Sequence, residues 1–552
     1  MNDINPVILK LLNKRGIFNE DEIAEFLSLK PQKTYDPFLL LNMEAGVDLI
    51  LSTIEKGEKI CIYGDYDADG ITSVCLLMKA LSHLTENLVY YIPSRFDEGY
   101  GLNMSAIESI YNDGVKLVVT VDCGSTSHEE VKFAKELGLE VIITDHHNIT
   151  CAIPDCIVIN PKQSDCKYPF KQLAGVGVAF KLLQAIQKKA NMPKSVIMEA
   201  LDLVAVGTIG DVAPLIDENR TLVKYGLKEL NKLEKKGMKE LANVICRKNE
   251  KINSESVAFT IVPHINAVGR MLSADTAAEL FISDDEKIIA RNVNKLVESN
   301  KERKEIQEET YRHCVEIVDA HLSKNKFLLI CAPDAHEGIA GIVAGKIKEK
   351  YNKPTVIVTT SGDVCKGTGR SIEGINIYEL LKNFEDLFIK FGGHSGACGF
   401  SMKQDDFKIL KTGIEDKMEE IFKSDPHIFD ENFDFDMELS EQDVTVSLGE
   451  LIECLAPFGH QNKKPTFCIN NVKHEKVSFM GDEGIHLRFT GVDLAGGMLQ
   501  YVLFNKAKEY KDMIYAYENM NVLGTIEVQT WNGAKRVQFI VEKLIPCENR
   551  SM

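Results

Sequence analysis

The stretch KICIYGDYDADGITSVCLLMKAL (59–81) decides the fold class of this chain. It begins with an apolar run typical of a buried strand and ends with an apolar run typical of a helix. Between the two runs, Asp65, Asp67 and Asp69 are spaced two residues apart, and Gly70 is expected to open the helix. If the segment is extended, the three carboxylates project to one side, and three like charges in one place favour a bound cation. The alternative is a strand-to-helix turn in which one aspartate caps the helix.

Short apolar segments alternate with helical ones up to residue 160. Strand candidates lie at 59–65, 88–93, 116–122, 140–145 and 156–160. Their nearly continuous apolar content predicts a parallel sheet with helices on both faces. Three candidates end in Asp65, Asp122 and Asp145, and open α/β sheets bind ligands at the carboxyl ends of their strands. We therefore expect a site where these aspartates meet.

Two histidines and a further aspartate extend this set of candidate ligands. His146 and His147 follow Asp145 directly. Adjacent residues on an extended backbone point to opposite sides, so we expect one histidine to bind an ion and the other to face substrate. Asp211 lies in the apolar helical stretch VAVGTIGDVAPL (204–215), where a carboxylate is costly unless it is paired or metal-bound. A helix cap is the alternative role for Asp211.

The pattern of the whole chain predicts an α/β protein with two α/β domains and a C-terminal OB-like β-barrel. The predicted regions are an N-terminal helical lead (1–45), a parallel-sheet domain (46–283), a long connecting helix (284–326), a second α/β domain (327–425), and an acidic linker with the barrel (426–552). Two glycine-rich segments, GTGRS (367–371) and FGGHSGACGF (391–400), fall in the second α/β domain. We predict the first of them to be a loop whose backbone approaches an anion closely.

Composition limits the classes of partner and compartment. The 64 Lys and Arg residues against 82 Asp and Glu give a formal net charge of −18, which opposes non-specific binding to nucleic acid. Two divalent cations in an acidic cleft would reverse the sign of the charge locally. No apolar stretch is long enough to span a membrane, and the start lacks the features of a signal peptide, so we expect a cytoplasmic protein without a membrane partner. The 14 cysteines include the cluster Cys151, Cys156 and Cys166, which lacks a fourth zinc ligand at the usual spacing.

Four motifs together resemble those of the DHH phosphoesterase superfamily: GDYDADG (64–70), VDCG (121–124), TDHH (144–147) and GTIGDV (207–212). Others resemble the RecJ family of bacterial single-strand-specific exonucleases within it. These are IPSRFDEGYGL (92–102), LAGVGVAFKL (173–182), INAVGR (265–270), HEGIAGIVAGKI (336–347), GTGRS, FGGHSGACGF and LAPFGHQNKKPTF (455–467). The resemblance spans residues 46 to 545 and is specific as a set.

The resemblance implies a centre of two Mn²⁺ or Mg²⁺ ions. Mixed imidazole and carboxylate ligation suits Mn²⁺, whereas Mg²⁺ prefers oxygen throughout. The implied ligands are Asp67, Asp69, Asp122, His146 and Asp211, with Asp122 as the bridge between the ions. The implied catalytic residues, near the phosphate or the attacking water, are Asp65, Asp145 and His147.

The resemblance also implies a set of substrate-binding residues. Arg95, Thr368 and Arg370 would hold a 5′ phosphate, and Arg270 would hold the DNA backbone nearer the scissile bond. Tyr100 would stack on a base, unless it is a packed core residue. Either Arg95 or Arg270 has the alternative of a structural ion pair, and His394 is either a phosphate ligand or a brace for its loop.

The implied activity is 5′-to-3′ hydrolysis of single-stranded DNA to 5′-mononucleotides, in DNA repair and recombination. A phosphodiesterase of short oligonucleotides or cyclic dinucleotides is one alternative, and such chains resemble the first two domains alone. A non-catalytic DNA-binding replication factor is another, and such a protein should have lost ligands. Single-stranded DNA is the implied partner. The sequence leaves open whether a single-strand-binding protein or a helicase is a further partner. Because every predicted metal and phosphate residue precedes Phe400, we expect the barrel to bind long strands and not to serve the chemistry.

Overall fold

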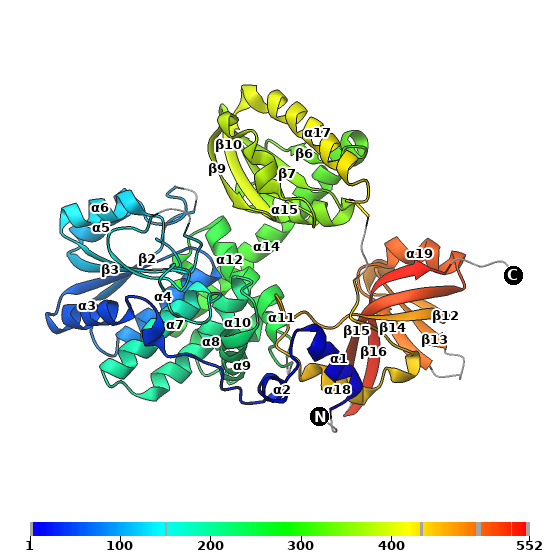
Figure 1. The fold of residues 1–552 in the computed structure, drawn as a ribbon, viewed down its shortest axis with the longest axis horizontal. Coiled ribbons are helices and arrows are strands. Elements are labelled where there is room, and N and C mark those ends of the chain that lie inside the picture. The colour runs from blue at the N-terminus through cyan, green and yellow to red at the C-terminus, as the bar shows by residue number, and fades with distance from the viewer. Residues whose placement is uncertain are drawn as a thin grey trace.

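In the part of the chain that the structure describes, three β-sheets organise the protein, two of five strands and one of six. The computed structural model describes residues 4–95, 97–149, 152–248, 250–430, 434–492, 498–531 and 533–547. Figure 1 shows the sheets as separate units, with the second α/β unit above the first and the barrel at the right. Among the described residues, no helix combines the length and the apolar character needed to cross a membrane.

The first sheet is parallel throughout, as predicted, and its strand order is β2-β1-β3-β4-β5. The strands are β1 (Lys59–Gly64), β2 (Leu88–Tyr91), β3 (Val115–Val121), β4 (Glu140–Thr144) and β5 (Ile157–Ile159). Alternate side chains of β1 enter two cores because successive residues of a strand point to opposite faces. Ile60 and Ile62 pack with helices α3 (Met43–Glu55), α4 (Ala68–Leu81) and α7 (Gly175–Lys189). Cys61 and Tyr63 pack with α5 (Met104–Asn112) and α6 (His128–Leu137).

The turn between β1 and α4 differs from the predicted one. Helix α4 begins at Ala68, because Asp67 Oδ1 accepts hydrogen bonds from the backbone N–H groups of Asp69 (2.9 Å) and Gly70 (3.1 Å) and caps the helix. The segment is therefore not extended as far as Asp69, and the expectation that Gly70 opens the helix was wrong. Gly70 instead allows a close approach, since a Cβ there would lie 2.4 Å from the carbonyl oxygen of Asp65.

Helices complete the first unit and connect it to the second. They are α8 (Lys194–Gly210), α9 (Asp217–Leu230), α10 (Lys236–Ile245), α11 (Ser254–Ser256), α12 (Val262–Met271) and α13 (Asp275–Ile282). The long connecting helix is present as α14 (Glu286–Ile317), 32 residues, which at about 1.5 Å per residue reaches roughly 48 Å. Ile289 and Leu296 near its start belong to the core of the first unit, and Cys314 near its end belongs to a core of the second.

The second sheet has the order β6-β7-β8-β10-β9 and is mixed, since β6 and β7 pair in parallel and the others antiparallel. The strands are β6 (Leu328–Cys331), β7 (Thr355–Ser361), β8 (Val364–Arg370), β9 (Phe388–His394) and β10 (Ala397–Lys403), with helices α15 (Glu337–Tyr351), α16 (Ile377–Lys382) and α17 (Phe407–Ser424). The prediction that Thr368 and Arg370 lie in a loop was wrong, because both are on β8. The glycines serve packing instead: a Cβ on Gly367 would lie 2.1 Å from the ring of Phe400.

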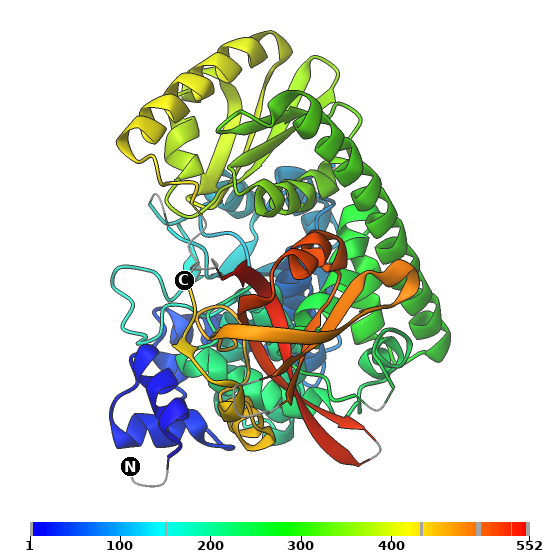
Figure 2. The same ribbon diagram turned by 90° about the vertical axis from the view of Figure 1, so that its right-hand side faces the viewer.

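The third sheet has the order β11-β12-β13-β14-β16-β15, and pairing of β12 with β15 closes it into the predicted barrel. Its elements are β11 (Met437–Glu438), α18 (Val446–Glu453), β12 (Phe467–Met480), β13 (His486–Val492), β14 (Met498–Leu503), α19 (Ala507–Ala516), β15 (Asn519–Trp531) and β16 (Ala534–Pro546). The N-terminal helices α1 (Pro6–Lys14) and α2 (Glu20–Leu27) adjoin this barrel (Figures 1 and 2). Leu11 and Leu12 share a core with Phe467, so the two ends of the chain pack together. The five region boundaries predicted from the sequence stay a prediction.

Candidate metal centre

The acidic candidates meet at the carboxyl ends of neighbouring strands. Asp65 follows β1, Asp122 follows β3 and Asp145 follows β4, and these three strands are adjacent in the sheet. Three overlapping sets of side chains place their ligand atoms within 4.8 Å of one another. The sets are Asp65, Asp67 and Asp122; Asp69, His146 and Asp211; and Asp122, His146 and His147. The fold thus brings together all five predicted metal ligands, and Asp122 belongs to two of the sets.

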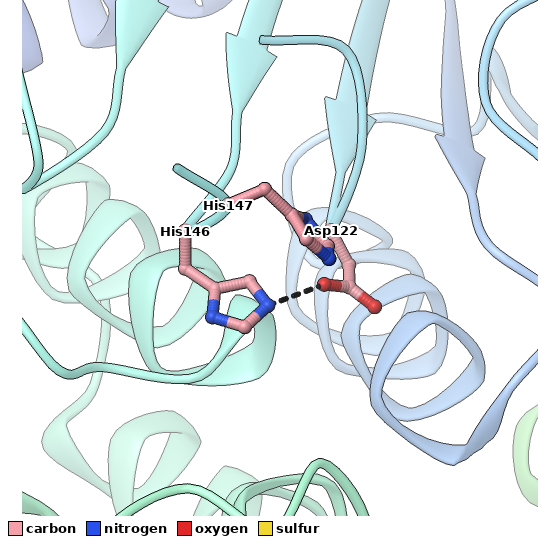
Figure 3. Close-up of side chains that lie close together, drawn as sticks. All are labelled: Asp122, His146 and His147. Carbon is pink, nitrogen blue, oxygen red and sulfur yellow. Dashed lines mark ion pairs between the residues drawn. The ribbon is translucent and has the colours of Figure 1, made fainter. Parts of the chain in front are cut away.

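Asp122 and His146 carry the clearest sign that a cation fits here. His146 Nε2 lies 3.0 Å from Asp122 Oδ1 (Figure 3), yet neither atom makes a hydrogen bond among the described residues, and both are buried. Asp65 Oδ1 is a third buried atom of this kind. Buried polar atoms without partners are costly, and a positive ion held between them would remove that cost. Carboxylate oxygens with one imidazole form a donor set that suits Mn²⁺.

The backbone around Asp122 is shaped to place its carboxylate. Asp122 has a positive φ of 62°, a conformation that aspartate tolerates better than most residues. Its N–H donates to Thr144 O at 3.0 Å, which ties it to the neighbouring strand. Gly175 at the start of α7 leaves room for it, since a Cβ there would lie 2.5 Å from Asp122 Oδ1. Gly175 was not among the residues predicted from sequence, although a glycine opening an apolar helix was the available signal.

The start of α7 also binds Asp69. Gly175 N–H and Val176 N–H donate to its two carboxylate oxygens at 2.7 and 2.8 Å. Even so, burial and the charge of Asp211 raise the pKa of Asp69 to about 7. Burial and the charge of Asp67 raise the pKa of Asp65 to about 8. Asp65 and Asp69 therefore resist ionisation in this cluster, and bound cations would reverse that resistance.

The two histidines do not point to opposite sides, contrary to the expectation from an extended backbone. Their rings lie 4.5 Å apart (Figure 3), because Asp145 Oδ1 accepts hydrogen bonds from both backbone N–H groups and draws the chain into a turn. Burial lowers the pKa of His146, which favours the neutral imidazole that a metal requires. His147 Nδ1 lies 2.8 Å from Asp145 Oδ1. Burial disfavours the charged forms of both His147 and Asp145. The contact between them outweighs that effect, so it raises the pKa of His147 and lowers the pKa of Asp145.

Asp211 and Tyr100 complete the surroundings of the cluster. Asp211 is the C-cap of α8, and its Oδ2 lies 3.7 Å from His146 Nδ1, so it is both a helix cap and a member of the cluster. The hydroxyl of Tyr100 donates to Asp122 O at 3.2 Å and lies 3.1 Å from His147 Nδ1. Tyr100 is 51% exposed, so it is not the packed core residue that was its alternative.

Arg95 and Arg270 lie beside the cluster, where the charge of Arg95 acts on Asp65 and the charge of Asp67 acts on Arg270. Among the residues that the structure describes, neither forms an ion pair with a carboxylate. Arg95 lies over the ring of Tyr66, 5.1 Å from its centre, and Arg270 Nη1 donates to Gly338 O at the start of α15. Burial, followed by the charge of Arg95, lowers the pKa of Arg270 to about 10. Two neighbouring guanidinium groups suit a phosphate.

Thr368 and Arg370 converge at α15 on the second unit. A Cβ on Gly341 would lie 3.1 Å from both Arg370 Nη2 and Thr368 Cγ2. His394 Nδ1 accepts from Gly396 N–H at 3.2 Å, which is the loop-brace contact foreseen as its alternative. The cysteine cluster, already disfavoured as a zinc site by its spacing, gains no ligands from the fold: Cys151 lies outside the described residues, and Cys156 and Cys166 belong to no cluster of metal-binding side chains among those that are described.

Comparisons with known proteins agree with this arrangement. Family models match residues 59–208 (DHH family, N-terminal domain), 324–424 (DHHA1 domain) and 435–543 (RecJ OB domain). The chain is 36% identical to the single-stranded-DNA-specific exonuclease RecJ of Bacillus subtilis, over 98% of this chain and 68% of that protein. Crystal structures of RecJ from Thermus thermophilus with Mn²⁺ and with Mg²⁺ superpose with TM-scores of 0.83 and 0.77, at 28% and 27% identity, covering 99% of this chain and 76% and 75% of theirs. An acidic and histidine cluster at the strand ends of a DHH unit, followed by a DHHA1 unit and an OB barrel, thus places this chain in the RecJ family of DHH phosphoesterases.

Proposed function

We propose that this protein is a metal-dependent exonuclease that degrades single-stranded DNA from its 5′ end and releases 5′-mononucleotides. Its relative in Bacillus subtilis is named a single-stranded-DNA-specific exonuclease, and the related crystal structures hold Mn²⁺ or Mg²⁺. The observation that carries the proposal is the pair of unpartnered buried atoms, Asp122 Oδ1 and His146 Nε2, inside overlapping sets of metal-binding side chains. The family implies a role in DNA repair and recombination.

Five side chains would hold two ions, with Asp122 shared between them. The ligands would be Asp67, Asp69, Asp122, His146 and Asp211, all of which lie in the overlapping sets of metal-binding side chains. When bound, the ions supply the positive charge that lowers the pKa of an attacking water and stabilises the entering and leaving oxygens of an in-line displacement at phosphorus. His147, held by Asp145, is positioned to exchange a proton near that water, and Asp65, which lies with Asp67 and Asp122, would contribute negative charge.

The arginines supply the anion site that an exonuclease needs. Arg95 and Arg270 would bind backbone phosphate beside the ions, and Thr368 and Arg370 would bind the terminal 5′ phosphate. Arg270 also contacts Gly338 of the second unit, so the two phosphate-binding pairs belong to units joined at α15. A fixed distance between a terminal-phosphate site and the ions would set the direction of degradation. Tyr100, exposed beside His147, would stack on a base.

The alternatives predict different substrates. A phosphodiesterase of short oligonucleotides would hydrolyse a dinucleotide at least as fast as a long strand, whereas an exonuclease with a DNA-binding barrel would prefer the long strand. The test is a comparison of kcat/KM for a 5′-phosphorylated dinucleotide and a single strand of about 30 nucleotides, with duplex DNA as control. A non-catalytic DNA-binding factor would hydrolyse neither, and the presence of every predicted ligand in the cluster argues against it. Protein partners such as a single-strand-binding protein or a helicase stay a prediction.

A further inference from the structure

The backbone directly after Asp211 adopts a conformation that its residue type disfavours. Helix α8 ends in a Schellman motif, in which Val212 N–H donates to Ile209 O at 3.1 Å and Ala213 N–H donates to Thr208 O at 3.2 Å. The motif requires a positive φ at Val212, and the value is 57°. Glycine is the usual residue at this position, and a β-branched side chain there is an outlier. Such a conformation persists where the surroundings hold it in place.

The loop between α18 and β12 provides that hold. His460 Nδ1 lies 3.0 Å from Val212 O, and Leu215 N–H donates to His460 O at 2.8 Å. Because a carbonyl oxygen only accepts, Nδ1 of His460 must carry the proton. One residue of the loop therefore binds the turn after Asp211 twice, once through its side chain and once through its backbone.

The loop is itself held to the first unit by two contacts on the N-terminal side of His460. Arg220 Nη1 on α9 donates to Leu455 O at 2.9 Å, and Ser254 Oγ on α11 donates to Phe458 O at 2.6 Å. Figure 1 shows this stretch of chain, between α18 and β12, beside the helices of the first unit. Gly459 permits the approach, since a Cβ there would lie 2.7 Å from the side chain of Leu215.

The carboxylate of Asp211 depends on this backbone for its direction. Across the part of the chain that the structure describes, no hydrogen bond reaches either of its oxygens, whereas Asp69 accepts two from α7. Its position 3.7 Å from His146 therefore depends on its backbone, which α8 holds on one side, through Asp211 N–H donating to Gly207 O at 2.8 Å, and the turn at Val212 holds on the other. We propose that His460, which precedes the C-terminal barrel, is a positioning residue of the metal centre: it holds Val212 in its strained conformation and so keeps Asp211 directed at the ions.

This inference rests on the proposed metal-dependent function and extends it to the C-terminal part of the chain. The sequence predicts that the C-terminal barrel, within residues 426–552, binds long strands without serving the chemistry. The contacts of His460 add a second role, in which the segment leading to the barrel completes the geometry of a ligand more than 200 residues earlier in the chain.

The test compares three variants of the full-length protein. His460→Ala removes the donor, and His460→Asn replaces it with an amide N–H at nearly the same place. Gln461→Asn is the control in the same loop, at an exposed position whose positive φ of 59° asparagine tolerates. Two quantities are measured: the Mn²⁺ concentration that gives half of the metal-induced rise in Tm, and kcat and KM separately on 5′-phosphorylated single strands. We expect His460→Ala to raise that Mn²⁺ concentration by about 10-fold, to lower kcat by about 10-fold, and to leave KM unchanged. Changes of this size are typical when a group that orients a metal ligand is lost. His460→Asn is expected to restore most of the Mn²⁺ response and of kcat, and Gln461→Asn is expected to match the wild type.

Two results would overturn the inference. One is a His460→Ala protein whose Mn²⁺ response and kcat equal those of the wild type. The other is a loss in His460→Ala that appears in KM or in the metal-free Tm while the Mn²⁺ response stays unchanged, because that pattern belongs to a DNA contact or a structural residue. Failure of the proposed function would look different, since the wild-type protein itself would then show no Mn²⁺-dependent hydrolysis.

Discussion

His146 Nε2 lies 3.0 Å from Asp122 Oδ1, and neither atom makes a hydrogen bond among the described residues. Asp122 stands at the end of β3 with a positive φ, and His146 follows β4, the next strand in the sheet. Burial, together with the charges of Asp69 and Asp67, raises the pKa of Asp122 well above its usual range. The contact therefore joins a carboxylate that resists its charge to a neutral imidazole, an arrangement that a cation would stabilise.

Asp122→Asn is expected to abolish Mn²⁺-dependent hydrolysis and to raise the Tm of the metal-free protein. Asparagine preserves the size of the side chain and tolerates the positive φ, so the change removes mainly one negative charge. Each kcal/mol of relieved repulsion should raise Tm by about 2–4 °C in a unit of this size. Turnover with Mn²⁺ checks the expected loss of hydrolysis, and the Tm measured in EDTA checks the expected rise in stability. Wild-type turnover in the purified variant would contradict the role of Asp122.

The stability of the metal-free protein should depend on pH through Asp211. Burial and the charge of Asp67 raise its pKa from 3.8 to about 7 in the folded state. A group with a raised folded pKa contributes stability that is present below its unfolded pKa and is lost as pH rises through the folded value. In EDTA, Asp211→Asn should therefore melt above the wild type at pH 8, and the difference should close towards pH 5.

Mn²⁺ at pH 8 should reverse the order of the two Tm values, so that the wild type melts above Asp211→Asn, because the wild-type carboxylate then binds the ion and the variant lacks that carboxylate. Asp512→Asn, at an exposed position of α19, is the matched control and should show neither effect. A difference in Tm between wild type and Asp211→Asn that stays constant from pH 5 to pH 8 in EDTA would refute the raised pKa of Asp211.

Recognition of the 5′ phosphate should depend on Arg370. If its guanidinium binds that phosphate, removing the phosphate from the DNA should lower kcat/KM of the wild type by about 10- to 100-fold, the range for a charge-assisted hydrogen bond. The same treatment should change kcat/KM of Arg370→Ala far less, since its contact is already lost. Lys408→Ala on α17 removes a positive charge elsewhere on this unit and should respond as the wild type does. Equal responses of wild type and Arg370→Ala would mean that the phosphate is bound elsewhere.

A buried ion pair should determine much of the stability of the first unit. Lys181 and Glu218 are fully buried with 2.5 Å between Nζ and Oε1, and Tyr168 donates to the same carboxylate. Lys181→Met should cost about 3–5 kcal/mol of unfolding free energy, because it leaves the Glu218 charge without its partner. The double variant Lys181→Met with Glu218→Gln should cost less than the single one. Chemical denaturation checks both, and a double variant less stable than Lys181→Met would contradict the account.

The parallel sheet and its acidic edge could be predicted because both depend on local pattern. Each of the five strands is a short apolar run, and Asp65, Asp122 and Asp145 follow three of them directly. The features that the sequence predicted wrongly depend on contacts between distant residues or on turn geometry. The sequence of β8 is typical of a glycine-rich loop, and only the packing of the Phe400 ring against Gly367 explains why it is a strand. The positions of the His146 and His147 rings likewise follow from the hydrogen bonds that Asp145 accepts from their backbone N–H groups.

Other features had no local signal at all. Leu11 and Leu12 lie on α1, an ordinary amphipathic helix. Nothing in the sequence of that helix indicates that it packs against the barrel, some 450 residues later in the chain. His460 stands in a polar loop, and its role depends on Val212, whose positive φ contradicts the preference of its residue type. Positions where local preference and structure disagree are expected at functional sites.

The most direct test of the central claim is the identity of the first product released from a single strand labelled at its 5′ phosphate. The protein is incubated with Mn²⁺ and this strand, and the label is followed by thin-layer chromatography from the earliest time points. The account predicts that the label appears first as a 5′-mononucleotide, with the remaining strand shortened from that end. A label that stays on progressively shorter strands, as in degradation from the 3′ end, or that is first released on longer oligonucleotides, would contradict it.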